Sequence, residues 1–244
     1  MKHIAVLLGL ALLTSCAGAD RQQVRVAKPG LHVADVAMAS GMPETALQVT
    51  REILQSHPDD SAALLRQAEA LVALGRVDAA AECYVRVLAH SPRSSEALRG
   101  IGRMRLAKGE AVEAEAAFRK AIDADATDTA ALNDIGIALD LQDRHDEAQT
   151  AYQAALAQRP EMAAAQVNLG LSLALAGEPE RALTILRPLA ADPAADGRVR
   201  QNLALALAMA GDEAGAGRIL LADMPPDKVT AALAGYAALK VPAK

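Results

Sequence analysis

The apolar residues between Ser61 and Ser94 recur at the spacing of an α-helix on both sides of a short turn at Leu74-Gly75-Arg76. This pattern predicts two amphipathic helices that pack against each other. Gly75 can adopt the left-handed conformation that ends a helix, and Pro92 is placed to stop the second helix. The stretch is therefore expected to fold as a helix pair.

The same pattern repeats along the chain with a period of 34 residues. The turn position is a glycine in five repeats and an aspartate in one: Gly41, Gly75, Gly109, Asp143, Gly177 and Gly211. An alanine stands five residues after each turn, at Ala46, Ala80, Ala114, Ala148, Ala182 and Ala216. The second helix carries an aromatic residue at Tyr84, Phe118 and Tyr152. Because all these positions keep one phase, we predict six stacked helix pairs.

A 34-residue period, with small residues in the helix pair and loop prolines at Pro58, Pro92 and Pro160, resembles the tetratricopeptide repeat family. The resemblance implies an all-α superhelix, or α-solenoid, of about six helix pairs over residues 27–226. Residues 227–244 are then expected to form a C-terminal capping helix and tail, with the helix running from Lys228 to Leu239 after an N-cap at Asp227. Such a helix would cover the open apolar face of the last repeat.

Residues at the expected helix ends support this division. Good N-cap residues precede the first helices at equivalent places, at Asp60, Ser94, Asp128 and Asp196. Pro43 is expected at the first turn of a second helix, where proline is tolerated. Pro188 instead falls inside a second helix and predicts a kink between Thr184 and Pro188. The second helix of the sixth repeat is expected to end near Asp223.

Composition and charge narrow the possible functions. The chain of 244 residues is 52% hydrophobic and 23% charged, which is ordinary for a globular protein, and alanine carries much of the apolar total. Its formal net charge is −5. Because nucleic-acid-binding domains usually carry a clustered basic surface, this balance argues against a nucleic-acid partner.

The N-terminal residues differ from the repeats. Ile4 to Leu13 form a short apolar run after Lys2, a pattern typical of a secretory signal peptide over residues 1–15. The following Leu13-Thr14-Ser15-Cys16 resembles the lipobox of bacterial lipoproteins, which implies lipidation of Cys16 and a lipidated tether over residues 16–26. Since Ala17 is not aspartate, the resemblance implies an outer-membrane anchor that faces the periplasm. The alternative is an ordinary signal peptide that contains a cysteine.

The sequence offers little for chemistry, and we expect neither an enzyme nor a catalytic, cofactor-binding or metal site. Gly100-Ile101-Gly102 resembles the start of a dinucleotide-binding motif, but no strand precedes it and close helix packing explains it better. The histidines are not paired with other ligands at metal-binding spacing. Cys83 is interpreted as a small buried residue, with a redox or interchain role as the alternative. No small-molecule substrate is expected.

In the tetratricopeptide family the first helix of each repeat lines a concave groove. Carried onto this sequence, the early repeats place a mixed polar set there: Lys28, Asp35, Glu69, Glu96, Arg99 and Arg103. The later repeats place a mainly apolar stripe there, with polar residues at its edge: Asn133, Ile137, Leu141, Val167, Leu171, Leu175, Arg198, Gln201, Leu205 and Met209. This stripe either packs internally or binds an amphipathic helix of a protein partner.

The C-terminal third shows a narrower resemblance. Leu186-Arg187-Pro188-Leu189, the run from Arg198 to Leu205, and Asp223-Met224-Pro225-Pro226-Asp227 are similar to the TadD-type lipoproteins of tight-adherence (Flp) pilus machines. This resemblance implies a scaffold or adaptor lipoprotein that supports pilus assembly by binding protein, with the pilus secretin or its associated components as the expected partner. The alternative is a tetratricopeptide lipoprotein that acts as an adaptor in envelope or peptidoglycan-enzyme assembly.

Overall fold

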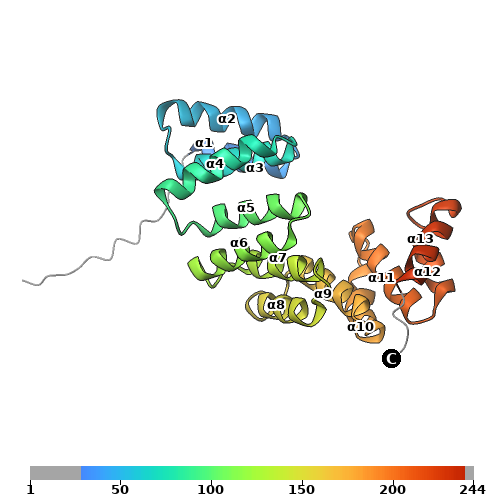
Figure 1. The fold of residues 1–244 in the computed structure, drawn as a ribbon. Coiled ribbons are helices and arrows are strands. Elements are labelled where there is room, and N and C mark those ends of the chain that lie inside the picture. Colours follow the sequence, from blue (N-terminus) through green and yellow to red (C-terminus); the bar gives the residue numbers. More distant parts are fainter. Residues whose placement is uncertain (1–28, 240–244) are drawn as a thin grey trace, which may run out of the picture.

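In the computed structural model, which describes residues 29–239, the chain folds into a continuous stack of antiparallel helix pairs (Figure 1). Within this range there are thirteen helices and no strand. The helices are α1 (Pro29–Ala39), α2 (Pro43–Ser56), α3 (Ser61–Ala73), α4 (Val77–His90), α5 (Ser95–Ala107), α6 (Ala111–Ala124), α7 (Thr129–Asp140), α8 (His145–Gln158), α9 (Ala163–Leu175), α10 (Pro179–Ala190), α11 (Gly197–Met209), α12 (Glu213–Leu220) and α13 (Pro226–Ala238). The predicted all-α superhelix of six helix pairs and a C-terminal helix is confirmed.

The predicted signal peptide, tether, Cys16 and Lys28 lie outside the described residues. The last five residues, 240–244, also lie outside them. No helix between residues 29 and 239 has the length and hydropathy needed to cross a membrane.

Side-chain caps fix where the first helices begin. The four predicted N-cap residues each accept hydrogen bonds from backbone N–H groups of the helix that follows: Asp60, Ser94, Asp128 and Asp196. These bonds satisfy donors that have no partner inside the helix. Pro43 opens α2 at the first helical turn, as predicted.

The turn within each pair needs a left-handed residue. All five turn glycines have positive φ, from 69° at Gly41 to 90° at Gly211. Asp143 takes the same place in the fourth pair with a φ of 57°. Among residues 29–239 it is the only residue other than glycine with positive φ, so the turn geometry is kept there at a steric cost.

The two helices of each pair meet at small residues. The six alanines that follow the turns are all fully buried: Ala46, Ala80, Ala114, Ala148, Ala182 and Ala216. The buried rings of Phe118 and Tyr152 lie against Gly102 and Gly136 of the first helix in the same pair. The buried ring of Tyr84 on α4 lies against Gly100 on α5, the first helix of the next pair. The interpretation of Gly100 and Gly102 as packing residues is therefore confirmed.

Contacts between pairs give the stack its curvature. Each first helix contacts the first helix of the next pair, in the series α1, α3, α5, α7, α9, α11 and α13. Second helices of neighbouring pairs, such as α2 and α4, make no such contacts within the described chain. Because the first helices are closer together, they line the concave inner face, and the second helices diverge on the outer face.

The C-terminal end differs from the prediction in its boundaries. α12 ends at Leu220 rather than near Asp223, and turns carry the chain to Pro225. α13 begins at Pro226 with Pro225 as its N-cap, so Asp227 lies in the first turn and does not cap the helix. Proline is favourable at the first helical position because it has no N–H to leave unpaired, and here it determines the start of the helix.

α10 continues through Pro188 and ends at Ala190. It is two residues shorter than the equivalent α8, because α8 has 14 residues and α10 has 12. Proline removes a helical hydrogen bond and weakens the last turn, which accounts for the earlier end. The kink between Thr184 and Pro188 stays a prediction.

Candidate protein-binding groove

The early part of the concave face consists of charges that neutralise one another. Arg66 Nε on α3 lies 2.5 Å from Asp35 Oδ1 on α1. Arg103 on α5 donates to both carboxylate oxygens of Asp134 on α7, at 2.6 and 3.3 Å. These bonds join first helices of neighbouring repeats. The predicted polar set therefore acts mainly as a connection between repeats and leaves little free charge for a ligand.

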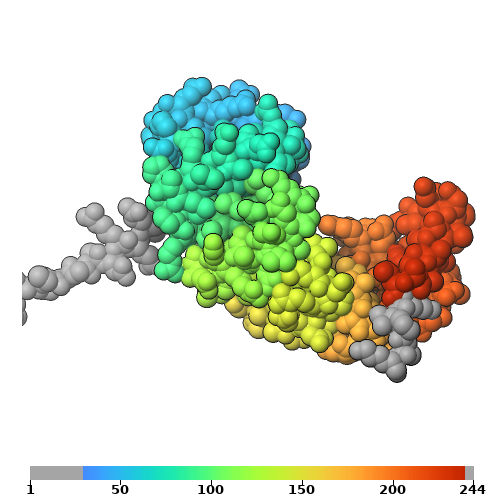
Figure 2. All heavy atoms as spheres, in the orientation of Figure 1, coloured from blue at the N-terminus to red at the C-terminus, as the bar shows by residue number. Residues whose placement is uncertain are grey.

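A large groove opens further along the same face. It has a volume of about 1050 Å³ and is lined by residues of α5, α7, α9 and α11 and by the segment from Leu189 to Asp196. In Figure 2 the surface is indented between the green repeats and the red C-terminal helices, with orange residues lying deeper between them. The groove includes these members of the predicted stripe: Asn133, Ile137, Val167, Leu171, Arg198 and Gln201.

Three other members of the predicted stripe lie outside the groove. Leu141 follows the last residue of α7 and is 62% exposed. Leu175 and Met209 end α9 and α11 and are half-buried. These positions all fall at the ends of first helices, beyond the segment that surrounds the groove.

The prediction that Leu205 lines an open groove is wrong, because this side chain is only 5% exposed. α13 packs against α11, and the Tyr236 hydroxyl donates to the backbone carbonyl of Gln201 at 3.4 Å, one helical turn before Leu205. The C-terminal helix therefore covers this region of α11. For Leu205 the alternative interpretation, internal packing, is the correct one.

Amide side chains give the groove a polar line that the sequence analysis missed. Asn168 Nδ2 on α9 donates to Asn133 Oδ1 on α7 at 2.9 Å, and Asn202 lines the groove from α11. Asp134, Asn168 and Asn202 stand at the same place in successive repeats, 34 residues apart. This periodic series of polar residues could have indicated the polar line from the sequence. The amides lie beside apolar residues of the groove, so they can bond the backbone of a bound peptide while Ile137 and Leu171 contact the side chains of that peptide.

A serine, a histidine and an aspartate do meet elsewhere, but not as a catalytic triad. Asp140 accepts from His145 Nδ1 at 2.8 Å, from Ser172 Oγ at 2.7 Å and from the Tyr152 hydroxyl at 2.8 Å. Ser172 is fully buried and bonds the carboxylate rather than the imidazole, so the serine–histidine bond that a triad needs is missing here. The network joins α7, α8 and α9. No cluster of three or more metal-binding side chains occurs within residues 29–239.

Known sequences and structures agree with this architecture. The profile of the tetratricopeptide repeat family matches residues 34–84, 65–129 and 133–197. The chain belongs to the tetratricopeptide repeat family. Members of this family typically act as non-catalytic scaffolds that bind other proteins. No relative among curated proteins matches the chain.

Several solved tetratricopeptide repeat structures superpose on the chain. PilW, a widely conserved type IV pilus biogenesis factor, is 22% identical with a TM-score of 0.69, over 78% of this chain and 88% of PilW. PilF of Pseudomonas aeruginosa is 16% identical with a TM-score of 0.65, over 79% of this chain and 87% of PilF. A tetratricopeptide repeat protein of Parabacteroides merdae is 15% identical with a TM-score of 0.63, over 85% and 83% of the two chains. At these identities the likeness shows the fold alone.

Two of the C-terminal segments singled out in the sequence, residues 198–205 and 223–227, meet in space. Arg200, at the start of α11, donates to both carboxylate oxygens of Asp223 at 2.5 and 2.8 Å and to the Ala195 carbonyl at 2.7 Å. These bonds tie the segment before α11 to the turn before α13. The arginine and the aspartate in the motif therefore have a structural role, since they hold the boundary of the groove in place.

Proposed function

We propose that this tetratricopeptide repeat protein is an outer-membrane lipoprotein that faces the periplasm and supports assembly of the tight-adherence (Flp) pilus machine. It does so by binding a segment of another machine component, the secretin or a protein associated with it. The observation that carries the proposal is the groove of repeats three to six, where apolar and amide side chains remain open on the concave face.

The chemistry of the groove favours an amphipathic helix as the bound segment. Ile137, Val167 and Leu171 come from successive parts of α7 and α9 and form an apolar strip. Asn168, Asn202 and Gln201 lie beside it and can bond the polar edge of the same segment. A helix with one apolar face would bury the strip and leave its polar side in contact with the amides.

Three observations support the pilus assignment. The segments around Pro188, Arg200 and Asp223 are similar to TadD-type lipoproteins. The lipobox-like Leu13-Thr14-Ser15-Cys16 follows a signal-like run. PilW, which shares the fold, is described as a type IV pilus biogenesis factor, and PilF of Pseudomonas aeruginosa shares the fold as well.

Lipidation of Cys16 tests the anchoring part of the proposal. Cys16→Ala should abolish incorporation of labelled palmitate and should release the protein from the outer-membrane fraction or leave an unprocessed precursor, because acyl chains provide the attachment. Cys83→Ala is the matched control and should keep the label. Equal labelling of the Cys16→Ala variant would contradict the lipoprotein assignment.

Pilus formation tests the function. In a strain that lacks the gene, Leu171→Glu should fail to restore surface pili, since a carboxylate would disrupt the apolar strip. Val112→Glu adds the same charge at an exposed position at the start of α6, away from the groove, and should restore pili fully. Normal pili with Leu171→Glu would exclude the groove as the binding site. Normal pili in the deletion strain would exclude the pilus function and favour the envelope-assembly alternative.

A further inference from the structure

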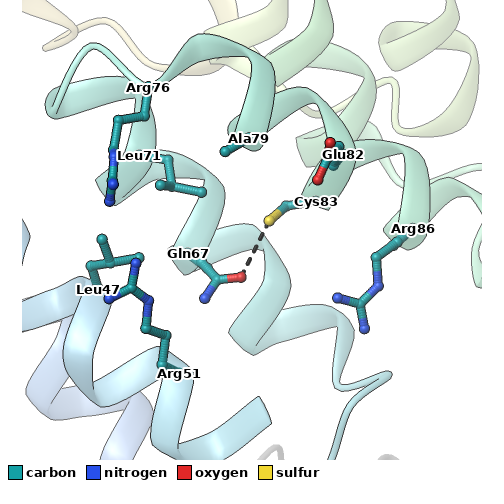
Figure 3. A pocket seen from close by; sticks show the side chains of 9 residues that line it. All are labelled: Leu47, Arg51, Gln67, Leu71, Arg76, Ala79, Glu82, Cys83 and Arg86. Carbon is teal, nitrogen blue, oxygen red and sulfur yellow. Dashed lines mark hydrogen bonds between the residues drawn. The ribbon is translucent and has the colours of Figure 1, made fainter. Parts of the chain in front are cut away.

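A second pocket lies between the second helices α2 and α4, near the N-terminal end of the stack (Figure 3). We call it the outer pocket. It has a volume of about 320 Å³ and is lined by Leu47, Arg51, Gln67, Leu71, Arg76, Ala79, Glu82, Cys83 and Arg86. It exists because α2 and α4 diverge above α3, as second helices do throughout this stack.

The outer pocket faces away from the groove. Its base is formed by Gln67 and Leu71 of α3, which correspond in the 34-residue repeat to Ile135 and Leu139 of α7. Both of those α7 residues belong to the buried core, whereas the α7 residues that line the groove are different ones. The outer pocket is therefore separate from the site of the proposed function.

The pocket carries an excess of positive charge. Arg51, Arg76 and Arg86 line it with a single acid, Glu82. Figure 3 shows Arg51 and Arg76 on the side of Leu47, and Arg86 on the opposite side. Burial raises the pKa of the Cys83 thiol, which donates to Gln67 Oε1 at 3.3 Å, so this cysteine is neutral at pH 7. Arg86 already donates to the Pro58 carbonyl at 2.5 Å and lies 3.6 Å from Asp59 Oδ1. The Gln67 amide, Arg51 and Arg76 are thus the polar groups available to a ligand.

The equivalent cleft two repeats later shows what such a pair of arginines binds. Between α6 and α8, the buried carboxylate of Glu115 lies 2.5 Å from Arg119 Nη2 and accepts from Arg144 Nη1 at 2.9 Å. Glu147 accepts two more bonds from Arg144, at 2.6 and 2.7 Å. Only 2% of Glu115 is exposed, and its burial is compensated by the two arginines and by Gln142, whose amide donates to Glu115 Oε2 at 2.8 Å.

The two clefts share the arginine pair but not the carboxylates between them. Counting in steps of the repeat, Arg51 and Arg76 occupy the places of Arg119 and Arg144. The places of the two carboxylates, Glu115 and Glu147, are taken by Leu47 and Ala79. Neither Arg51 nor Arg76 has a side-chain hydrogen bond or ion pair with any residue between 29 and 239. At these four positions the cleft keeps the two arginines and lacks the two carboxylates.

We infer that the outer pocket binds a carboxylate supplied by an acidic segment of a partner protein. The carboxylate lies between Arg51 and Arg76, as that of Glu115 lies between Arg119 and Arg144. Leu47, Leu71 and Ala79 contact the methylene groups that carry it, and the Gln67 amide can donate a further bond. Charge complementarity selects an acidic partner, and the apolar part of the lining favours a glutamate side chain over a free anion.

The experiment uses the whole chain in a mild detergent, labelled with ¹⁵N-arginine, and follows the Nε–H signals of Arg51 and Arg76. The probe is the acetylated and amidated peptide Ala-Ala-Glu-Ala-Ala, and the control probe carries glutamine in place of glutamate. Acetate is titrated separately as a free carboxylate. The double variant combines Arg51→Gln with Arg76→Gln. The control variant is Arg159→Gln, which removes an exposed arginine outside the pocket.

The glutamate peptide should shift the Arg51 and Arg76 signals saturably, and the glutamine peptide should not. The double variant should bind at least about tenfold more weakly, since both charged donors are lost. Arg159→Gln should bind as the unsubstituted chain does, and so should Leu171→Glu, which separates this site from the groove. Equal binding of the glutamine peptide, or unchanged binding by the double variant, overturns the proposal. Saturation by acetate at the same concentrations overturns the assignment to a protein segment.

Discussion

Gly102 and Phe118, from the two helices of one repeat, are so close that a Cβ at Gly102 would lie 2.3 Å from Phe118 Cε1. Phe118 is fully buried, so its ring has little room to move. Gly102→Ala should therefore lower the free energy of unfolding by about 1–3 kcal/mol, because overpacking outweighs the better helix propensity of alanine.

A matched substitution tests whether this cost comes from packing. No atom lies within 4 Å of the position where a Cβ would be added at Gly235, in α13. Gly235→Ala should raise the free energy of unfolding by about 0.5–1 kcal/mol, since alanine favours the helix. Urea denaturation of the two variants measures both changes. A stabilised Gly102→Ala variant would show that the two helices are further apart than described.

The turn at Asp143 gives the second prediction. Its φ of 57° matches the five turn glycines, but an L-residue pays a steric cost there that glycine does not. Asp143→Gly should stabilise the protein by up to about 1 kcal/mol, and Gly109→Ala should destabilise it by a similar amount. Thermal unfolding of both variants checks the pair. A destabilised Asp143→Gly variant would mean that the aspartate side chain contributes more than its backbone strain costs.

These packing and turn positions explain why the fold was predictable. Because the 34-residue spacing is constant, the same type of residue makes the same contact in each repeat. The role of Ala114 or Gly109 in one repeat therefore predicts the role of the equivalent residue in the others. The N-caps such as Asp60 are local in the same way. The boundaries of α12 and α13 were less predictable because that part of the chain leaves the period, and Pro226 starts a helix that the aspartate after it was expected to cap.

The groove was predictable only where it is periodic. Ile137 and Leu171 follow from the repeat, but the part played by the segment from Asp192 to Asp196, which lines one side of the groove, could not be predicted from its place in the repeat. Leu205 keeps the repeat position and is nevertheless buried, because α13 replaces a further repeat. Arg51 and Arg76 could not be recognised from the sequence as lacking a partner among residues 29–239, since that required the structure, with the geometry of Glu115 as a comparison.

Buried tyrosines should make the stability fall at high pH. Burial raises the pKa of Tyr84 to about 12, and burial together with the Asp140 carboxylate raises the pKa of Tyr152 as well. In the unfolded chain both tyrosines have the ordinary pKa of about 10. The unfolded state therefore loses protons first, so the stabilising contribution is complete below about pH 10 and is lost as the pH rises toward 12.

This linkage is measured by urea denaturation between pH 8 and pH 11.5 or so. The decline above pH 10 should be smaller in Tyr84→Phe than in the unsubstituted chain. Tyr84→Phe is the cleaner variant, because Tyr152→Phe also removes the hydrogen bond to Asp140. Identical slopes for the two proteins would show that Tyr84 ionises as readily in the folded state as in the unfolded one.

The last prediction separates the groove from the core at one repeat position. Leu171 and Leu205 are 34 residues apart and equivalent in sequence, but Leu171 lines the groove and Leu205 is buried beside α13.

Leu205→Glu places a carboxylate where only 5% of the native side chain is exposed, so water cannot solvate the charge well. It should therefore lower the free energy of unfolding on the order of 2–5 kcal/mol. Leu171→Glu keeps its carboxylate at the edge of an open groove, where water can solvate it, and should change the stability by less than about 1 kcal/mol. Leu205→Met, which conserves volume and polarity, is the control for the buried site. Parallel urea titrations of the three variants give the answer: if Leu171→Glu is as unstable as Leu205→Glu, the apolar strip is core and repeats three to six offer no open binding surface.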